Sequence, residues 1–230
     1  MSANHKKRLA MPRSWAQPRK TTIWISKPDP CGHPIEMCMS LTVVIRDELG
    51  LAHTKREVRR MLATRNILVD GRVPKSVDRG IGLMDVLTIG DENYRCILDQ
   101  NGKLRYPKIS SSDANSKICR IDGKNTVSGG TTQYNLHDGR NILLDKANAY
   151  STGDSLVISL PDQTVRGHHP FTDGARAYLI GGSHVGSISE VQSLTVKRSS
   201  MENEVSFPEF GTVKRNVFVI GDFELPEVDE

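Results

Sequence analysis

Residues 54–73, TKREVRRMLATRNILVDGRV, predict a capped helix that leads directly into a strand and a tight turn. Thr54 and Glu57 have the spacing of a capping box, in which each side chain satisfies a backbone N–H at the start of a helix. A narrow apolar stripe follows at helical spacing and consists of Val58, Met61 and Leu62. The apolar run 67–69 then ends at Asp70-Gly71, a dipeptide typical of a hairpin turn.

Basic residues occupy the other face of this predicted helix. Arg56 and Arg60 are four residues apart, as are Lys55 and Arg59, so like charges lie side by side and cost helix stability. Residues 54–75 hold seven Lys or Arg against two acids. Such a surface is typical of a helix that meets a polyanion, although a solvated basic face is a common alternative.

The flanking sequence extends this stretch into a small helix–helix–strand unit over residues 36–90. Apolar residues at helical spacing predict a first helix over 36–49, which Gly50 ends. Residues 85–89 indicate a further strand. From residue 91 short strands alternate with turn dipeptides, of which Asn101-Gly102 is the strongest hairpin signal. Frequent short strands of this kind favour a barrel or a sandwich.

Both ends of the chain differ from its middle. The chain has 230 residues and a net charge of +4, but residues 1–28 carry seven Lys or Arg and no acid. Residues 222–230 carry five acids and no base, which indicates a solvated tail. Trp15 and Trp24 both lie in the proline-rich basic segment, so we expect it to become ordered against the protein body or a partner. A flexible basic arm is the alternative.

Several classes of protein are excluded by composition. Four cysteines are too few for a disulfide framework at this length and favour a reducing compartment. The apolar runs are too short for a membrane helix, and the basic start lacks the apolar core of a secretory signal. We therefore expect a cytoplasmic protein without a membrane partner.

Four segments in a fixed order carry a family resemblance. Residues 6–9 and Pro12-Arg13-Ser14-Trp15 form a basic run followed by a proline, a basic residue and tryptophan. Residues 54–73 with 82–86 resemble a small RNA-binding module, residues 174–191 resemble a KOW turn between two strands, and residues 216–221 resemble a closing strand. Together these segments resemble the small-subunit ribosomal protein family S-four-e. The acidic end of the chain favours an archaeal-type member.

The resemblance implies an α+β, multidomain fold and a structural role. The expected units are a basic extension (1–35), the RNA-binding module (36–90), a central β domain (91–172), a KOW or SH3-like barrel (173–222) and an acidic tail (223–230). The chain would bind and stabilise folded small-subunit ribosomal RNA beside neighbouring ribosomal proteins during translation. By analogy with the module and the basic arm, the RNA-binding candidates are Lys6, Lys7, Arg8, Arg13, Trp15, Arg19, Lys20, Lys55, Arg56, Arg59, Arg60, Arg65, Arg72 and Lys75.

The resemblance implies no enzyme, cofactor or small-molecule substrate, and the sequence offers weak signals for them. Some pseudouridine synthases carry the same module but need an aspartate in a Gly-Arg-Leu-Asp setting, whereas Gly139-Arg140 is followed here by Asn141. Cys31, His33 and Cys38 could supply three metal ligands, but they lack the paired Cys-x-x-Cys form, so we predict no metal. An RNA-modifying enzyme and a free RNA chaperone are the alternative functions.

Overall fold

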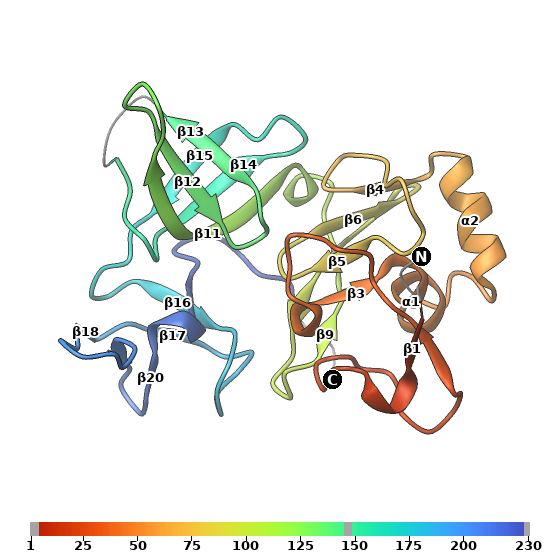
Figure 1. Ribbon diagram of the computed structural model, residues 1–230, viewed down its shortest axis with the longest axis horizontal. Coiled ribbons are helices and arrows are strands. Elements are labelled where there is room, and N and C mark those ends of the chain that lie inside the picture. Colours follow the sequence, from red (N-terminus) through yellow and green to blue (C-terminus); the bar gives the residue numbers. More distant parts are fainter. Residues whose placement is uncertain (1–4, 145–148, 228–230) are drawn as a thin grey trace.

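The computed structural model describes residues 5–144 and 149–227, and strands predominate over helices in these ranges (Figure 1). The predicted α+β class is confirmed in the coarse sense of a mostly β, multi-sheet protein with few helices. The N-terminal half forms the right side of Figure 1, the five-stranded sheet lies at the upper left, and the C-terminal strands lie below it.

The module around the quoted stretch contains a four-stranded antiparallel sheet in the order β10-β7-β6-β4. Its strands are β4 (Ile67–Val69), β6 (Val86–Ile89), β7 (Glu92–Arg95) and β10 (Lys108–Ile109). Asp70 and Gly71, which follow β4, have φ angles of 50° and 74°. Both residues therefore adopt the left-handed conformation that an Asp-Gly turn supplies at low cost. The predicted strand–turn segment is confirmed.

Helix α2 (Lys55–Ala63) begins where the sequence predicts, because both hydrogen bonds of the capping box are present. The Thr54 hydroxyl accepts from the Glu57 N–H at 3.2 Å, and the Glu57 carboxylate accepts from the Thr54 N–H at 3.3 Å. Val58 is fully buried and attaches the helix to the body. The opposite face of α2 remains open to solvent.

The helix predicted over residues 36–49 is only partly correct. Its first residues form a 3₁₀ turn (Ile35–Met37) and strand β3 (Cys38–Ser40), which pairs with β5 (Gly80–Gly82). Helical backbone begins with α1 (Leu41–Val43) and continues as a π-helical turn (Val44–Glu48). The residues of α1 are completely buried, so tertiary pairing of β3 rather than helical periodicity decides where the helix starts.

The basic N-terminal segment is ordered against the protein body. Strand β1 (His5–Lys7), which precedes a 3₁₀ turn (Arg8–Ala10), pairs with β2 (Trp24–Ser26), and a small set of apolar side chains enters the main core. These are Met11, Trp15 and Ile25. Of the two expected possibilities, ordering against the protein body is the one that the structure shows.

The main core crosses the predicted unit boundaries. It includes Tyr106 and the short hairpin of β8 (Ile97–Leu98) and β9 (Leu104–Arg105), which confirms the Asn101-Gly102 turn. It also includes Tyr178 and Phe218 from the C-terminal part of the chain. Tyr178 donates its hydroxyl to the carbonyl of Leu98 at 2.6 Å, so the C-terminal part is fixed to the module.

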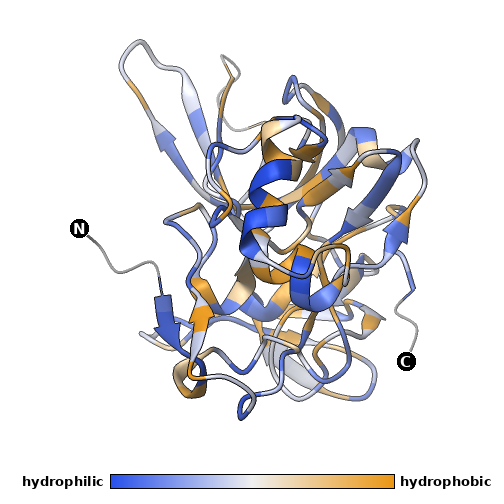
Figure 2. Cartoon of the chain, turned by 90° about the vertical axis from the view of Figure 1, so that its right-hand side faces the viewer, coloured by the Kyte–Doolittle hydropathy of each residue, from blue (hydrophilic) through white to orange (hydrophobic). Residues whose placement is uncertain are grey.

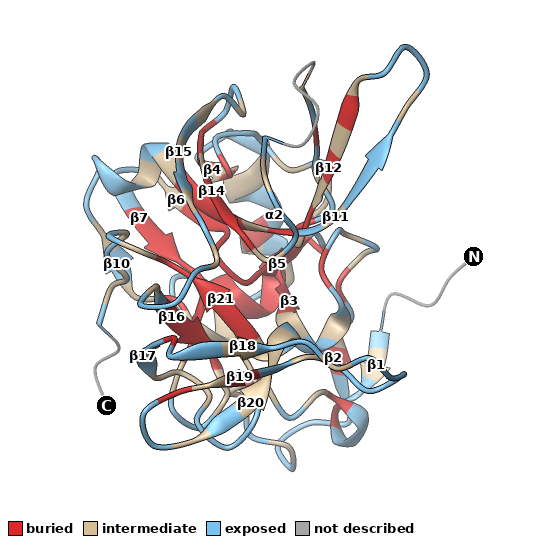
Figure 3. Ribbon diagram, turned by 90° about the vertical axis from the view of Figure 1, so that its left-hand side faces the viewer, coloured by how far each residue is buried: buried red, intermediate tan, exposed pale blue. Residues whose placement is uncertain are grey.

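The central part of the chain is a five-stranded antiparallel sheet in the order β13-β12-β11-β14-β15. A 3₁₀ turn (Asp113–Asn115) precedes it, and its strands are β11 (Ser116–Thr126), β12 (Thr132–Leu136), β13 (Asn141–Leu144), β14 (Ser155–Ser159) and β15 (Val165–His169). It has a small apolar core of its own that includes Ile121, Tyr134 and Ile158. The outer half of the β11–β12 hairpin projects from the body and is largely exposed (Figure 3).

Two three-stranded sheets complete the C-terminal part. The first, in the order β17-β16-β21, contains β16 (Arg176–Leu179), β17 (Ile188–Glu190) and β21 (Val217–Val219), the last preceded by a 3₁₀ turn (Lys214–Asn216). The second contains β18 (Ser193–Thr195), β19 (Glu204–Ser206) and β20 (Gly211–Val213). The glycine-rich turn predicted over 181–186 lies between β16 and β17, as expected.

The segment predicted as a solvated acidic tail is corrected by the structure. Phe223 and Leu225 pack against the main core, and the guanidinium of Arg95 lies 4.6 Å from the centroid of the Phe223 ring. Apolar residues between the acids therefore attach this segment, while residues 228–230 lie outside the described ranges. Within the described ranges, no helix has the length and apolar character needed to cross a membrane.

Candidate nucleic-acid interface

Helix α2 presents arginines that are free for an external partner. Arg56, Arg59 and Arg60 are exposed, and their guanidinium groups form no ion pair with the described residues. Helix α2 lies in front of the body in Figure 2, with hydrophilic residues along its outer side. Lys55 differs, because its ammonium pairs with the buried carboxylate of Asp78 at 2.6 Å. The charge of Lys55 is therefore already paired with an acid of the same protein.

Basic residues of the neighbouring loops extend this surface. Arg65 lies in the connection from α2 to β4 with a φ of 59°, and it is exposed. Arg72 and Lys75 are exposed in the loop after β4, although Arg72 also donates to the carbonyl of Pro161 at 3.1 Å. The nearby Arg79 is exposed as well and was not among the sequence candidates.

The N-terminal candidates separate into structural and accessible residues. Arg8 is buried, and its Nε donates to the carbonyl of Pro18 at 2.5 Å, so it holds the loop between β1 and β2. Trp15 is 1% exposed, and its indole N–H donates to the carbonyl of Ile35 at 3.3 Å. Its predicted role in RNA binding is corrected, because a core indole cannot stack on a base. Lys7, Arg13 and Lys20 are exposed, whereas Lys6 and Arg19 are half-buried.

Trp24, which is not among the RNA-binding candidates from sequence, is the accessible tryptophan of the basic segment. It is 49% exposed, and the Lys7 ammonium lies 3.9 Å from the centroid of its ring. The usable signal was the alternation of strand β2, in which Ile25 enters the core and its neighbours face outward. An exposed indole beside basic side chains is a typical platform for a nucleobase.

Basic residues of the C-terminal sheets are offset by acids. Lys197 pairs with Glu204 at 2.5 Å, and Arg215 pairs with Glu202 at 3.2 Å. Burial lowers the pKa of Lys214, whose ammonium donates to the carbonyl of Thr152 at 2.8 Å. This region is therefore a poorer attractor of phosphate than the outer face of α2.

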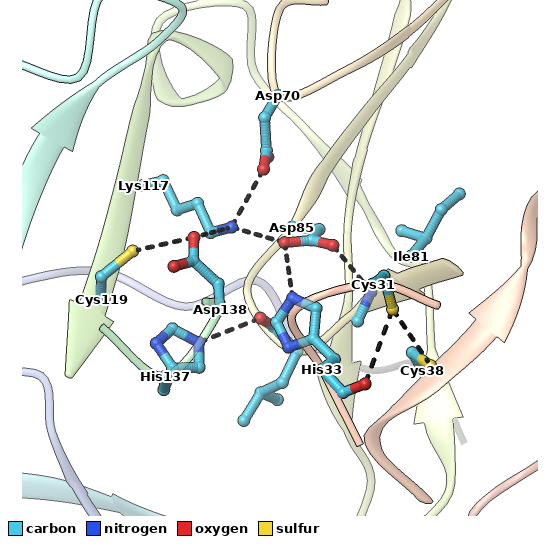
Figure 4. A network of polar contacts seen from close by, with 12 residues as sticks. Cys31, His33, Cys38, Asp70, Ile81, Asp85, Lys117, Cys119, His137 and Asp138 are labelled. Carbon is cyan, nitrogen blue, oxygen red and sulfur yellow. Dashed lines mark hydrogen bonds and ion pairs between the residues drawn. The ribbon is translucent and has the colours of Figure 1, made fainter. Parts of the chain in front are cut away.

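A buried cluster of charges lies where β11 meets the module (Figure 4). The ammonium of Lys117 is fully buried and lies 3.0 Å from Asp70, 2.5 Å from Asp85 and 2.8 Å from Asp138. Burial opposes the charge of Lys117, but these carboxylates outweigh it and hold the lysine pKa well above its usual value. Arg140 adds a second cation that contacts Asp70 and Asp138.

The carboxylates of this cluster are also the candidate ligands for a metal ion. Among the described residues, the one group of close potential ligands is Asp70, Asp85 and Asp138. The Lys117 ammonium lies among these carboxylates and supplies the positive charge that an ion would bring. His33 directs its Nε2 toward Asp85 at 3.0 Å and not toward Cys31 and Cys38, so these three residues do not converge on one point.

Comparison with known proteins identifies the family. The model of the ribosomal family S4e matches residues 90–165. The small ribosomal subunit protein eS4 of Methanocaldococcus jannaschii is 38% identical over 237 residues, which cover 96% of this chain and 95% of that protein. The chain belongs to the ribosomal family S4e. The eS4 protein of Methanocella arvoryzae is 37% identical over 227 residues and covers the same shares.

A solved structure supports the same assignment. The crystal structure of the S4e protein of Thermoplasma acidophilum superposes with a TM-score of 0.72 at 32% identity and covers 80% of this chain and 95% of that one. Family membership confirms the expected archaeal-type S4e protein, a structural constituent of the cytoplasmic small ribosomal subunit and not an enzyme.

Proposed function

We propose that this S4e protein holds folded small-subunit ribosomal RNA through the outer face of α2, the adjoining loops and the N-terminal hairpin. The observation that carries the proposal is the set of exposed arginines on α2, which have no acidic partner among the described residues. Arginine offers a planar fork of donors that matches the oxygens of a phosphate group. Because RNA helices expose phosphates and ribose hydroxyls, such a face suits recognition of shape rather than of sequence.

The proposed interface has two parts with different chemistry. The first is purely basic and comprises Arg56, Arg59, Arg60, Arg65, Arg72, Lys75 and Arg79, with Lys55 at its edge. The second is the N-terminal hairpin, where the Lys7 ammonium lies over the exposed ring of Trp24. The same segment also carries Lys6, Arg13, Arg19 and Lys20. The first part would follow the backbone of a helix, and the second would hold an unpaired base.

The described fold would keep these parts in fixed positions. The N-terminal hairpin contributes Ile25 to the same core as Val58 of α2, so the two basic regions are held to one body. RNA that contacts both regions therefore gains from a surface ordered in advance, and less ordering entropy is lost on binding.

The C-terminal sheets would face other partners of the subunit. We propose that β16 to β21 form the KOW or SH3-like barrel and that residues 91–172 form the central β domain, with the expected unit boundaries as working limits. The ion pairs at Lys197 and Arg215 reduce the free positive charge of the C-terminal sheets. Neighbouring ribosomal proteins are therefore the proposed contacts of this region.

Sedimentation of a native lysate on a sucrose gradient tests the proposed role. We expect the chain to travel with the small subunit and to persist through a moderate-salt wash, because many phosphate contacts act together. A chain that stays at the top of the gradient would contradict the proposal and favour a free RNA chaperone. Release of the double variant Arg56→Glu/Arg60→Glu, but not of the wild type, would place the contact on α2.

A further inference from the structure

Cys31 of the loop between β2 and β3 and Cys38, the first residue of β3, form a close pair. Cys31 Sγ lies 3.8 Å from Cys38 Sγ, which is van der Waals contact with a weak hydrogen bond (Figure 4). Cys31 is half-buried at the surface of the body, whereas Cys38 is buried at the start of β3. Of the two residues, Cys31 is therefore the one that is not fully covered, and the Cys38 sulfur lies next to its sulfur.

The environment makes the two sulfurs chemically unequal. The side-chain hydrogen bond with Cys38 lowers the pKa of Cys31 to about 6, although burial opposes this. The hydrogen bond to Cys31, with burial, raises the pKa of Cys38. Burial also raises the pKa of Cys96 and of Cys119, which are completely buried. Since the thiolate is the reactive form, Cys31 is the nucleophile of the set.

The backbone beneath the pair is glycine, which lets both sulfurs lie close to strand β5. The Cys31 sulfur packs on Gly80 of β5, where an added Cβ would lie 2.6 Å from it. Gly80 pairs with Ser40 of β3, so the surface beneath the pair is a fixed strand ladder. A disulfide needs the sulfurs to approach to about 2.05 Å, so closing the bridge requires the Cys31 side chain to turn toward Cys38.

We propose that Cys31 and Cys38 form an oxidative modification site, at which a peroxide converts the two thiols into an intramolecular disulfide. The Cys31 thiolate attacks one peroxide oxygen, the S–O bond forms, the O–O bond breaks, and the departing hydroxide takes a proton to become water. The Cys38 sulfur then attacks the Cys31 sulfur, the S–S bond forms, and the S–O oxygen leaves as a second water with the Cys38 proton. The two sulfurs lose two electrons, which reduce the peroxide.

The pair is arranged for the second step as well as for the first. The proximity of the Cys31 sulfur is a cause of the raised pKa of Cys38. Once Cys31 becomes a neutral sulfenic acid, its negative charge no longer opposes release of the Cys38 proton. Cys38 therefore becomes reactive at the moment when it is needed as the resolving thiol.

The experiment uses the complete, reduced chain treated with hydrogen peroxide at neutral pH, followed by alkylation and tryptic peptide mass spectrometry. No Lys or Arg lies between Cys31 and Cys38, so one tryptic peptide carries both. The expected product is this peptide without alkyl groups and lighter by two hydrogens. It should form at least about tenfold faster than Cys96 or Cys119 is modified, because those thiols are buried and protonated.

Two single variants separate sulfenic acid formation from disulfide closure. Circular dichroism first verifies that each variant is folded. Cys38→Ser should accumulate a Cys31 sulfenic acid that reacts with dimedone, and Cys31→Ser should leave Cys38 as a thiol. The proposal is overturned if the wild-type peptide remains a dithiol, if Cys31 is oxidised beyond the sulfenic state without the bridge, or if the four cysteines react at equal rates. It is also overturned if the urea-unfolded chain forms the bridge as fast as the folded chain, since sequence spacing alone would then suffice.

Discussion

The ammonium of Lys117 lies 3.0 Å from the carboxylate of Asp70, and this contact joins two different sheets. Lys117 belongs to β11 of the five-stranded sheet, whereas Asp70 follows β4 of the module. The same ammonium contacts Asp85, also of the module, and Asp138, which follows β12. The five-stranded sheet and the module around α2 are therefore joined through the buried charge of Lys117, with Arg140 as a second cation between Asp70 and Asp138.

Replacement of this lysine should destabilise the whole protein. In Lys117→Met, the carboxylates of Asp70, Asp85 and Asp138 would remain buried without their shared cation. Removal of one partner from a buried ion pair costs about 3–5 kcal/mol. We expect a loss of this size in the free energy of unfolding, measured by urea denaturation at pH 7.

An exposed ion pair supplies the matched control for this variant. Lys108 pairs with Glu92 at 2.5 Å, and its side chain is 66% exposed. Lys108→Met should therefore change stability by less than about 1 kcal/mol. Similar losses of unfolding free energy in Lys108→Met and Lys117→Met would show that burial does not determine how much the Lys117 ion pairs contribute to stability.

Acidification should destabilise the protein through His137. The Nδ1 of His137 accepts from the Arg120 N–H at 3.2 Å, and its Nε2 lies 3.3 Å from the carbonyl of Leu83, so the ring fits only as a neutral imidazole. Burial lowers the pKa of His137 to about 3. Between pH 6.5 and 3 the unfolded chain binds a proton that the folded chain refuses, so stability falls as the pH falls.

The size of this effect can be isolated with one variant. At pH 5 the lowered pKa corresponds to about 2 kcal/mol of lost stability relative to pH 8. His137→Asn should lose about that much less between pH 7 and pH 5, measured by urea denaturation at each pH. The buried carboxylates Asp85 and Asp138 have lowered pKa values and respond only below about pH 4. Burial opposes the charge of His33, but Asp85 raises its pKa, and burial raises the pKa of Asp70; both groups are present in both proteins, so only the difference between the two pH profiles reports His137. Parallel pH profiles for the two proteins would contradict the assignment.

The capping box of α2 should contribute measurably to stability. Thr54→Ala removes the side-chain acceptor of the Glu57 N–H and should cost about 1 kcal/mol in urea denaturation. Thr54→Ser keeps an oxygen in the same position and should recover most of the loss. Equal losses in both variants would indicate that the threonine methyl group, and not the hydrogen bond, is responsible.

Trp24 should contribute to RNA affinity but little to folding. Trp24→Ala should weaken binding to small-subunit ribosomal RNA by about 1–3 kcal/mol, the range for loss of a stacked base. Trp24→Phe retains a ring and should recover part of the affinity. A large drop in the unfolding midpoint of Trp24→Ala, with unchanged affinity for the RNA, would make this residue a structural one.

The charge of α2 should appear in the salt dependence of RNA binding. In Arg56→Gln/Arg60→Gln, two phosphate contacts are removed, so the slope of log K against log salt should become shallower by about 1.4–1.8. Charge reversal at Arg56 and Arg60 should weaken binding more than reversal at Lys197 and Arg198. The C-terminal pair is the matched control, and equal losses at both places would count against the α2 face.

The elements that were predicted correctly depend on interactions between residues close together in the sequence. The capping box at Thr54, the Asp70-Gly71 turn and the Asn101-Gly102 hairpin depend on neighbouring residues, and all three are present in the structure. The exposed arginines of α2 follow from the same helical spacing. The order of motifs along the chain also sufficed to indicate the family.

The sequence could not decide which side chains of the polar and aromatic candidates face outward. Trp15 and Trp24 lie in the same basic segment, yet one enters the core and the other stays exposed, because distant residues such as Ile35 cover the first. The role of Lys117 in a buried ion-pair cluster could not be predicted, since its partners Asp70 and Asp138 lie far from it in the chain. Local hydrogen bonds and spacing thus fixed the helix cap, the turns and the basic face, whereas burial and charge pairing depend on contacts that exist only after the sheets have packed together.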